Sequence, residues 1–80
     1  MKTFNHIDDC WAAIRACKTI EEVNEILAEI PHGFGEWWVD VVYLNGVPCY
    51  EVTNHYYDKL FDDYFTDEEI LDIPVNEEDL

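Results

Sequence analysis

The chain has 80 residues, and its 19 acidic against 4 basic residues give a formal net charge of −15. Because 49% of the residues are hydrophobic and 15% are aromatic, a core can form, which excludes a disordered acidic tail. The charge also argues against direct binding to nucleic acid or to anionic membranes, since like charges repel. We therefore expect one domain, with a basic protein as its natural kind of partner.

The first thirty residues predict two helices. Apolar residues spaced three and four apart form one helical stripe, with Asn5 as its N-cap: Ile7, Cys10, Trp11, Ile14 and Cys17. A capping box, Thr19-x-x-Glu22, begins the second helix, which Pro31 ends. Its buried stripe is Ile20, Val23, Leu27 and Ile30, with Ile26 beside it. The short connection predicts an antiparallel αα-hairpin.

A β-hairpin is the clearest local signal. Residues 36–44 and 47–53 flank Asn45-Gly46, the preferred dipeptide of a type I′ turn. A two-residue turn places Val41 opposite Tyr50 and Asp40 opposite Glu51. One face then forms the core side, with Trp37, Val39, Val41, Tyr43, Pro48, Tyr50 and Val52. Because Pro48 lacks an N–H, it marks the second strand as an edge.

The C-terminal part predicts one or two further helices. The first starts at Asn54, with apolar residues at helical spacing: Tyr57, Leu60, Phe61, Tyr64 and Phe65. A second capping box, Thr66-x-x-Glu69, precedes a short helix that Pro74 ends. The expected fold class is thus α+β in the order ααββα(α), with an N-terminal αα-hairpin, a two-stranded antiparallel β-hairpin and C-terminal helices. Residues 1–74 would form a single compact acidic domain, and residues 75–80 a flexible acidic tail.

The sequence contains no residue pattern that is typical of catalysis or of cofactor binding. Cys10, Cys17 and Cys49 are an odd number without metal-ligand spacing, which predicts free thiols, no metal site and a reducing, cytoplasmic location. The N-terminus has no signal-peptide pattern, and no apolar run is long enough to span a membrane. The acid-rich run at 62–72 lacks the pattern of an EF-hand loop. There is no serine nucleophile and little room for a cleft, so we expect no enzyme and no cofactor.

The charged and aromatic residues favour a function in binding another protein. Asp40 and Glu51 are like charges directly opposed across the hairpin, a costly arrangement of the kind that is kept for function. Trp38 points away from Trp37, so it fills a second small core or serves as an exposed anchor. Residues 58–80 add ten acids against one base. The candidate partner-binding residues are Trp38, Asp40, Glu51, Asp58, Asp62, Asp63, Asp67, Glu68 and Glu69.

In size, acidity and lack of motifs, the chain resembles phage-encoded DNA-mimic proteins that block restriction or CRISPR systems. It is similar in the same way to acidic immunity proteins and antitoxins that cap nucleases. The resemblance implies an inhibitor of a basic, nucleic-acid-binding protein such as a nuclease or a defence complex. It is carried by charge and length, so it assigns no residue a role. Two alternatives stay open: a small intracellular interaction module that uses Trp38 and the edge strand, and a metal-responsive regulator. Monomer and dimer are equally compatible with the sequence.

Overall fold

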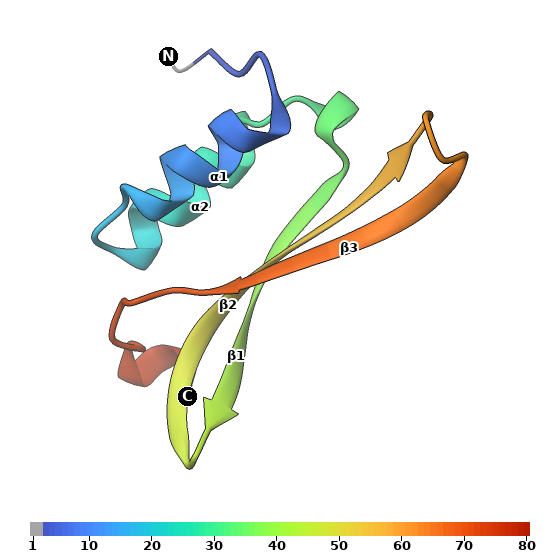
Figure 1. Cartoon of the computed structure of the whole chain (residues 1–80). Coiled ribbons are helices and arrows are strands. Elements are labelled where there is room, and N and C mark those ends of the chain that lie inside the picture. Colours follow the sequence, from blue (N-terminus) through green and yellow to red (C-terminus); the bar gives the residue numbers. More distant parts are fainter. Residues whose placement is uncertain (1–2) are drawn as a thin grey trace.

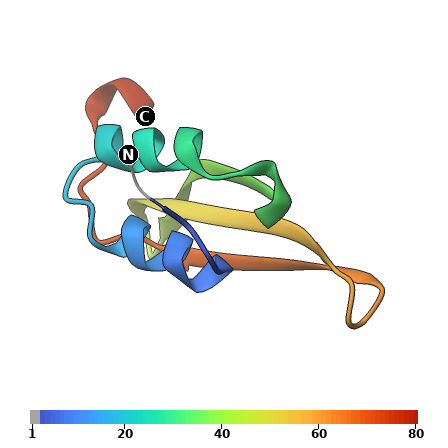
Figure 2. The same ribbon diagram turned by 90° about the horizontal axis from the view of Figure 1, so that it is seen from above.

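The computed structural model describes residues 3–80, which form two helices packed on a three-stranded sheet. The elements are α1 (Ile7–Arg15), α2 (Ile20–Glu29), a 3₁₀ turn (His32–Phe34), β1 (Glu36–Leu44), β2 (Val47–Asp58), β3 (Asp63–Ile70) and a second 3₁₀ turn (Glu77–Asp79). The sheet is antiparallel in the order β1-β2-β3. Both helices lie on the same side of this twisted sheet, and the β2–β3 hairpin extends beyond them (Figure 1 and Figure 2).

Both predicted N-terminal helices are present. The capping box at α2 is confirmed, because the Thr19 hydroxyl accepts the Glu22 N–H at 3.2 Å and the Glu22 carboxylate accepts the Thr19 N–H at 3.2 Å. At α1 the cap is His6 and not Asn5: the imidazole Nδ1 accepts the Asp8 N–H at 3.1 Å. Asp9 completes a capping box at the start of α1 by accepting the His6 N–H at 3.0 Å.

The core lies between the helices and the sheet. Ile26 is buried in it, whereas Leu27 is only partly buried at its margin, so the stripe of α2 is rotated slightly from the predicted one. Trp11 of α1 and Trp37 of β1 join the two layers, with ring centroids 5.0 Å apart. The buried hydrophobic residues are Cys10, Trp11, Ile14, Ile20, Val23, Ile26, Ile30, Tyr50, Val52 and Leu71.

The β1–β2 hairpin forms as predicted. Asn45 and Gly46 have φ values of 51° and 82°, the positive values that a type I′ turn requires at both central positions. The register places Val41 opposite Tyr50 and Asp40 opposite Glu51. The core face carries the predicted residues, although Tyr43 is 62% exposed.

The predicted C-terminal helices, and with them the two-stranded sheet, are wrong. β2 continues through Asn54 to Asp58, and the chain then turns into β3. Asp62, the last residue of this turn, has a φ of 51°. The apolar spacing of residues 57–65 suits a helix and also a hairpin. The helix prediction fails because Tyr, Phe and Thr favour strands, and because β2 offers a partner edge for β3. β2 is therefore the central strand. It lacks a β3 partner only near Pro48, since β3 ends opposite Glu51.

Asn54 and Gly35 hold the start of β1 against β2. Asn54 is fully buried, and its side-chain amide donates to the carbonyl oxygens of Phe34 and Glu36, both at 3.0 Å. Gly35 has a φ of 91°, and the backbone of residues 55–56 lies directly against it. These contacts replace the helix start predicted at Asn54 and set where β1 begins.

The last six residues fold back onto the core. The buried Tyr50 hydroxyl accepts the Asn76 N–H at 3.0 Å and donates to the Asp79 carboxylate. Val75 is partly buried against the core. The flexibility predicted for residues 75–80 stays a prediction, now with defined contacts against which it can be measured.

Candidate functional site

The side of the sheet that faces away from the helices is the candidate binding surface, called here the open face. Neither helix covers it, as Figure 1 and Figure 2 both show. Because side chains alternate along each strand, the register assigns every second residue to it. Its members include Trp38, Asp40, Val42, Cys49, Glu51, Thr53, His55, Tyr57, Tyr64, Thr66 and Glu68.

Three carboxylates cross the middle of the open face, one from each strand. Asp40 of β1 faces Glu51 of β2, and Glu68 of β3 lies diagonally beside Glu51, opposite Thr53. Partial burial raises the pKa of Glu51 above its ordinary value, and the neighbouring Glu68 and Asp40 carboxylates raise it further. These three residues, Asp40, Glu51 and Glu68, are called the acid row.

Within residues 3–80, no cation pairs with the acid row. The ion pair found within residues 3–80 is Arg15–Glu69, on the helix side; at the start of α1, His6 Nδ1 lies 3.5 Å from the Asp8 carboxylate but acts as a neutral acceptor in the helix cap. The three negative charges therefore repel one another without a neutralising cation, and a hydrogen bond between Glu51 and Glu68 relieves part of this repulsion. Such a row costs stability and would attract a cationic surface.

Trp38 is exposed on the open face and is not part of a second core. Its side of β1 has no helix against it, and the residue is 40% exposed. The indole Nε1 donates to the Asp40 carboxylate at 3.1 Å, which holds the ring beside the acid row. An aromatic ring next to carboxylates suits a cationic side chain, because the ring face and the carboxylates both attract it.

The outer end of the β2–β3 hairpin carries a cluster of exposed apolar side chains, called here the aromatic tip. Its members are Tyr57, Leu60, Phe61, Tyr64 and Phe65, of which Leu60 is 84% and Phe61 65% exposed. The tip is ordered by its own contacts: Tyr57 packs edge-on to Tyr64 and Phe61 edge-on to Phe65. A protruding, ordered apolar cluster of this kind is characteristic of a binding surface.

Three of the predicted acids serve the aromatic tip. Asp58 accepts the Leu60 N–H at 2.9 Å and Asp63 accepts the Tyr64 N–H at 2.8 Å, while Asp62 accepts the Tyr57 hydroxyl. Their carboxylates surround the tip with negative charge as well as shaping its turn. The sequence predicts Asp58, Asp62 and Asp63 on one helix. In the structure they lie at the hairpin tip, apart from the acid row.

Asp67 and Glu69 lie on the other side of β3, toward the helices. The Glu69 carboxylate accepts from the Arg15 guanidinium, with Oε1 2.9 Å from Nε. This pair ties α1 to β3 and partly neutralises Glu69. Of the predicted residues, Trp38, Asp40, Glu51 and Glu68 therefore share one surface; Asp58, Asp62 and Asp63 share a second; Asp67 and Glu69 belong to neither.

The cysteines differ in their burial. Cys10 is fully buried in the core, and burial raises the pKa of its thiol above the ordinary value. All three cysteines are free of disulfides. In the described part of the chain, no group of three or more His, Cys, Asp or Glu side chains is arranged so that it could hold a metal ion. Nor does that part contain a helix that is both long and apolar enough to cross a membrane.

Comparison with known proteins adds no relative. A scan against protein-family models, a search of curated proteins and a search of solved structures each find no match to this chain. The function must therefore be argued from the open face and its surroundings.

Two features of the candidate site, the place of Glu68 and the exposure of the aromatic tip, are not predicted from the sequence. Glu68 was expected on a helix, so its place beside Glu51 was not foreseen. The aromatic tip was expected to be buried as the stripe of a helix. The signal that could have revealed both is the density of aromatic residues in 56–66, which favours strands.

Proposed function

We propose that the chain binds a basic protein through the open face and thereby keeps that protein from nucleic acid. The acid row is the observation that carries this proposal: three uncompensated carboxylates lie side by side on an uncovered surface. Nucleic acid presents a similar array of regularly spaced negative charge to its binding proteins. The net charge of −15 adds a long-range attraction that speeds encounter with a cationic partner.

The kind of protein proposed is an inhibitor, of the anti-restriction, anti-CRISPR or nuclease-immunity type, acting in the cytoplasm without catalysis. Inhibition of this type needs only a stable complex that covers the partner's basic surface. The aromatic tip and Trp38 would add apolar contacts, which electrostatic attraction alone does not supply.

The alternative is an ordinary interaction module whose partner is held by apolar contacts. The exposure of the aromatic tip favours it, because that cluster does not depend on charge. The two proposals differ in how binding responds to salt and to loss of the acid row. An electrostatic complex weakens steeply with ionic strength, whereas an apolar one changes little.

A pull-down from host-cell lysate at about 50 and about 500 mM salt tests the proposal. The baits are the wild type, an acid-row variant (Asp40→Asn, Glu51→Gln, Glu68→Gln) and a control with the same charge change elsewhere (Glu25→Gln, Glu29→Gln, Glu78→Gln). We expect a basic protein that wild type and control retain at low salt, that the acid-row variant loses, and that duplex DNA displaces. A protein retained at high salt by all three baits would favour the interaction module instead.

A further inference from the structure

The outer edge of β1 has backbone groups without partners. Asn45-Gly46 closes a two-residue turn, so Leu44 and Val47 form a hydrogen-bonded pair, and every second pair along the hairpin does the same. The intervening residues of β1 direct their N–H and C=O groups away from β2: Trp37, Val39, Val41 and Tyr43. Within residues 3–80, no hydrogen bond to these outward groups is found.

The two edges of the sheet differ in how they are protected. β3 carries Asp63, Asp67, Glu68 and Glu69, the kind of charged edge that resists pairing with another strand. β1 reads Glu-Trp-Trp-Val-Asp-Val-Val-Tyr-Leu, so between its first residue and its end only Asp40 is charged. β1 is therefore the edge that remains open to an added strand.

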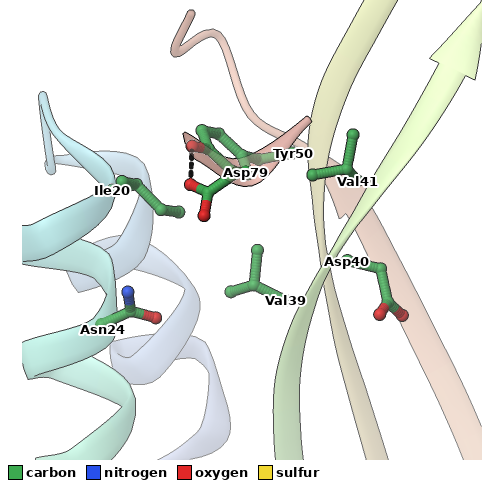
Figure 3. Close-up of a pocket in the computed structure, with 7 residues that line it drawn as sticks. All are labelled: Ile20, Asn24, Val39, Asp40, Val41, Tyr50 and Asp79. Carbon is green, nitrogen blue, oxygen red and sulfur yellow. Dashed lines mark hydrogen bonds between the residues drawn. The ribbon is translucent and has the colours of Figure 1, made fainter. Parts of the chain in front are cut away.

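A groove runs beside this edge on the helix side. It has a volume of about 190 Å³ and lies between α2, β1 and the C-terminal segment. Figure 3 shows Val39 pointing into it toward Ile20, while the Asp40 carboxylate points to the other side of the strand. Ile20, Val39 and Val41 line this side of the edge together with the polar Asn24 and Asp79, and the acid row begins on the other side.

We propose that β1 accepts an extended, basic segment of the partner protein as a fourth strand. An added strand would turn alternate side chains into the groove and onto the open face. Apolar side chains suit the groove beside Ile20, Val39 and Val41, and lysine or arginine suits the open face beside Asp40 and Trp38. The partner segment therefore alternates basic and apolar residues. This inference rests on the proposed function, because the same acid row selects the basic residues.

A second copy of the chain fits this edge poorly. Asp40 is the central residue of β1, so the symmetric antiparallel pairing that overlaps the whole of both strands would set Asp40 directly opposite Asp40. Each copy also brings a net charge of −15. The charge that favours a basic segment thus disfavours self-association.

The test uses a short acetylated peptide of alternating lysine and valine, titrated into the full-length, isotope-labelled protein and followed by NMR. Backbone N-methylation supplies matched controls. Methylating every valine removes the N–H groups that face β1 in an antiparallel addition, and methylating every lysine removes those that face it in a parallel one. We expect amide shifts centred on Trp37, Val39, Val41 and Tyr43, and at least tenfold weaker binding for one methylated peptide but not for the other.

Equal binding by both methylated peptides, or shifts centred on the aromatic tip, would overturn the added strand and leave the proposed function standing. Conversely, strand addition that is unaffected in the acid-row variant would sustain the edge but remove the charge-based function. Val41→Pro blocks the edge without touching a β1–β2 hydrogen bond and should abolish peptide binding. If sedimentation shows a concentration-dependent dimer that Val41→Pro disrupts, β1 serves a second copy and the basic segment is wrong.

Discussion

Glu51 is the residue at which the binding surface and the stability of the fold conflict. It lies on the central strand between Asp40 and Glu68, and partial burial together with both neighbours raises the pKa of its carboxyl. A carboxyl with a raised pKa is stabilising to the fold when protonated and destabilising when ionised. The acid row thus costs stability at neutral pH, as expected of a surface kept for binding.

Glu51→Gln should therefore stabilise the protein at pH 7 by a few tenths to about 1 kcal/mol. Below the ordinary pKa of 4.5, Glu51 is protonated in both folded and unfolded chains, so the advantage of the variant is smallest there. As pH rises, the unfolded chain loses its proton first and the wild type loses stability relative to the variant. Urea unfolding of both proteins from pH 4 to about 7 measures this. An advantage that stays constant across the range would mean that Glu51 repels nothing.

At the scale of elements, two close contacts decide how segments distant in sequence meet. The first is Gly35, where a Cβ atom would lie 2.5 Å from the His55 carbonyl oxygen and 2.6 Å from Tyr56 Cβ. Its φ of 91° is also unfavourable for any other residue. The backbone of β1 can approach β2 here only because the side chain is absent.

Gly35→Ala should destabilise the protein by at least about 2 kcal/mol, through both the clash and the backbone strain. Gly33→Ala is the matched control, since a Cβ there meets nothing within 4 Å. That change should be neutral or stabilise by up to about 1 kcal/mol, because it restricts the unfolded chain. Thermal unfolding of the two variants compares them, and similar stabilities would show that residues 35 and 55–56 are not in contact.

The second contact is the attachment of the C-terminal segment to Tyr50. Tyr50→Phe removes the hydroxyl that accepts the Asn76 N–H and donates to Asp79, so we expect a loss of about 1 kcal/mol and faster amide exchange at Asn76. Tyr43→Phe is the control, because Tyr43 has the same core-side orientation but is 62% exposed. Fast exchange at Asn76 already in the wild type would instead confirm the flexible tail predicted from the sequence.

At the scale of the whole molecule, net charge opposes both folding and self-association. Raising NaCl from about 20 to about 500 mM screens this repulsion and should raise Tm. The same change should weaken binding of the basic partner, so that stability and affinity move in opposite directions. The acid-row variant should show a smaller rise in Tm than the wild type in calorimetry. An equal rise in both proteins would locate the dominant repulsion outside the acid row.

Local signals determined the first two thirds of the fold. Thr19-x-x-Glu22 begins α2 because the two residues cap each other, and Asn45-Gly46 places the turn and therefore the register of Asp40 against Glu51. Such features depend on residues close in sequence, so they can be read directly. The charge of −15, which motivates the proposed partner, is also a property of the sequence alone.

Tertiary structure decided the rest. The apolar spacing of residues 57–65 suits both a helix and a hairpin; their aromatic residues favour strands, and the free edge of β2 supplies the partner that selects β3. That choice brings Glu68 beside Glu51, separates it from Asp67 and Glu69, and leaves the aromatic tip exposed instead of buried. Strand pairing joins residues distant in sequence, and its energy depends on the neighbouring strand, which no local pattern records. For the same reason, the sequence alone does not identify β1 as the open edge, which follows from the central position of β2 in the sheet.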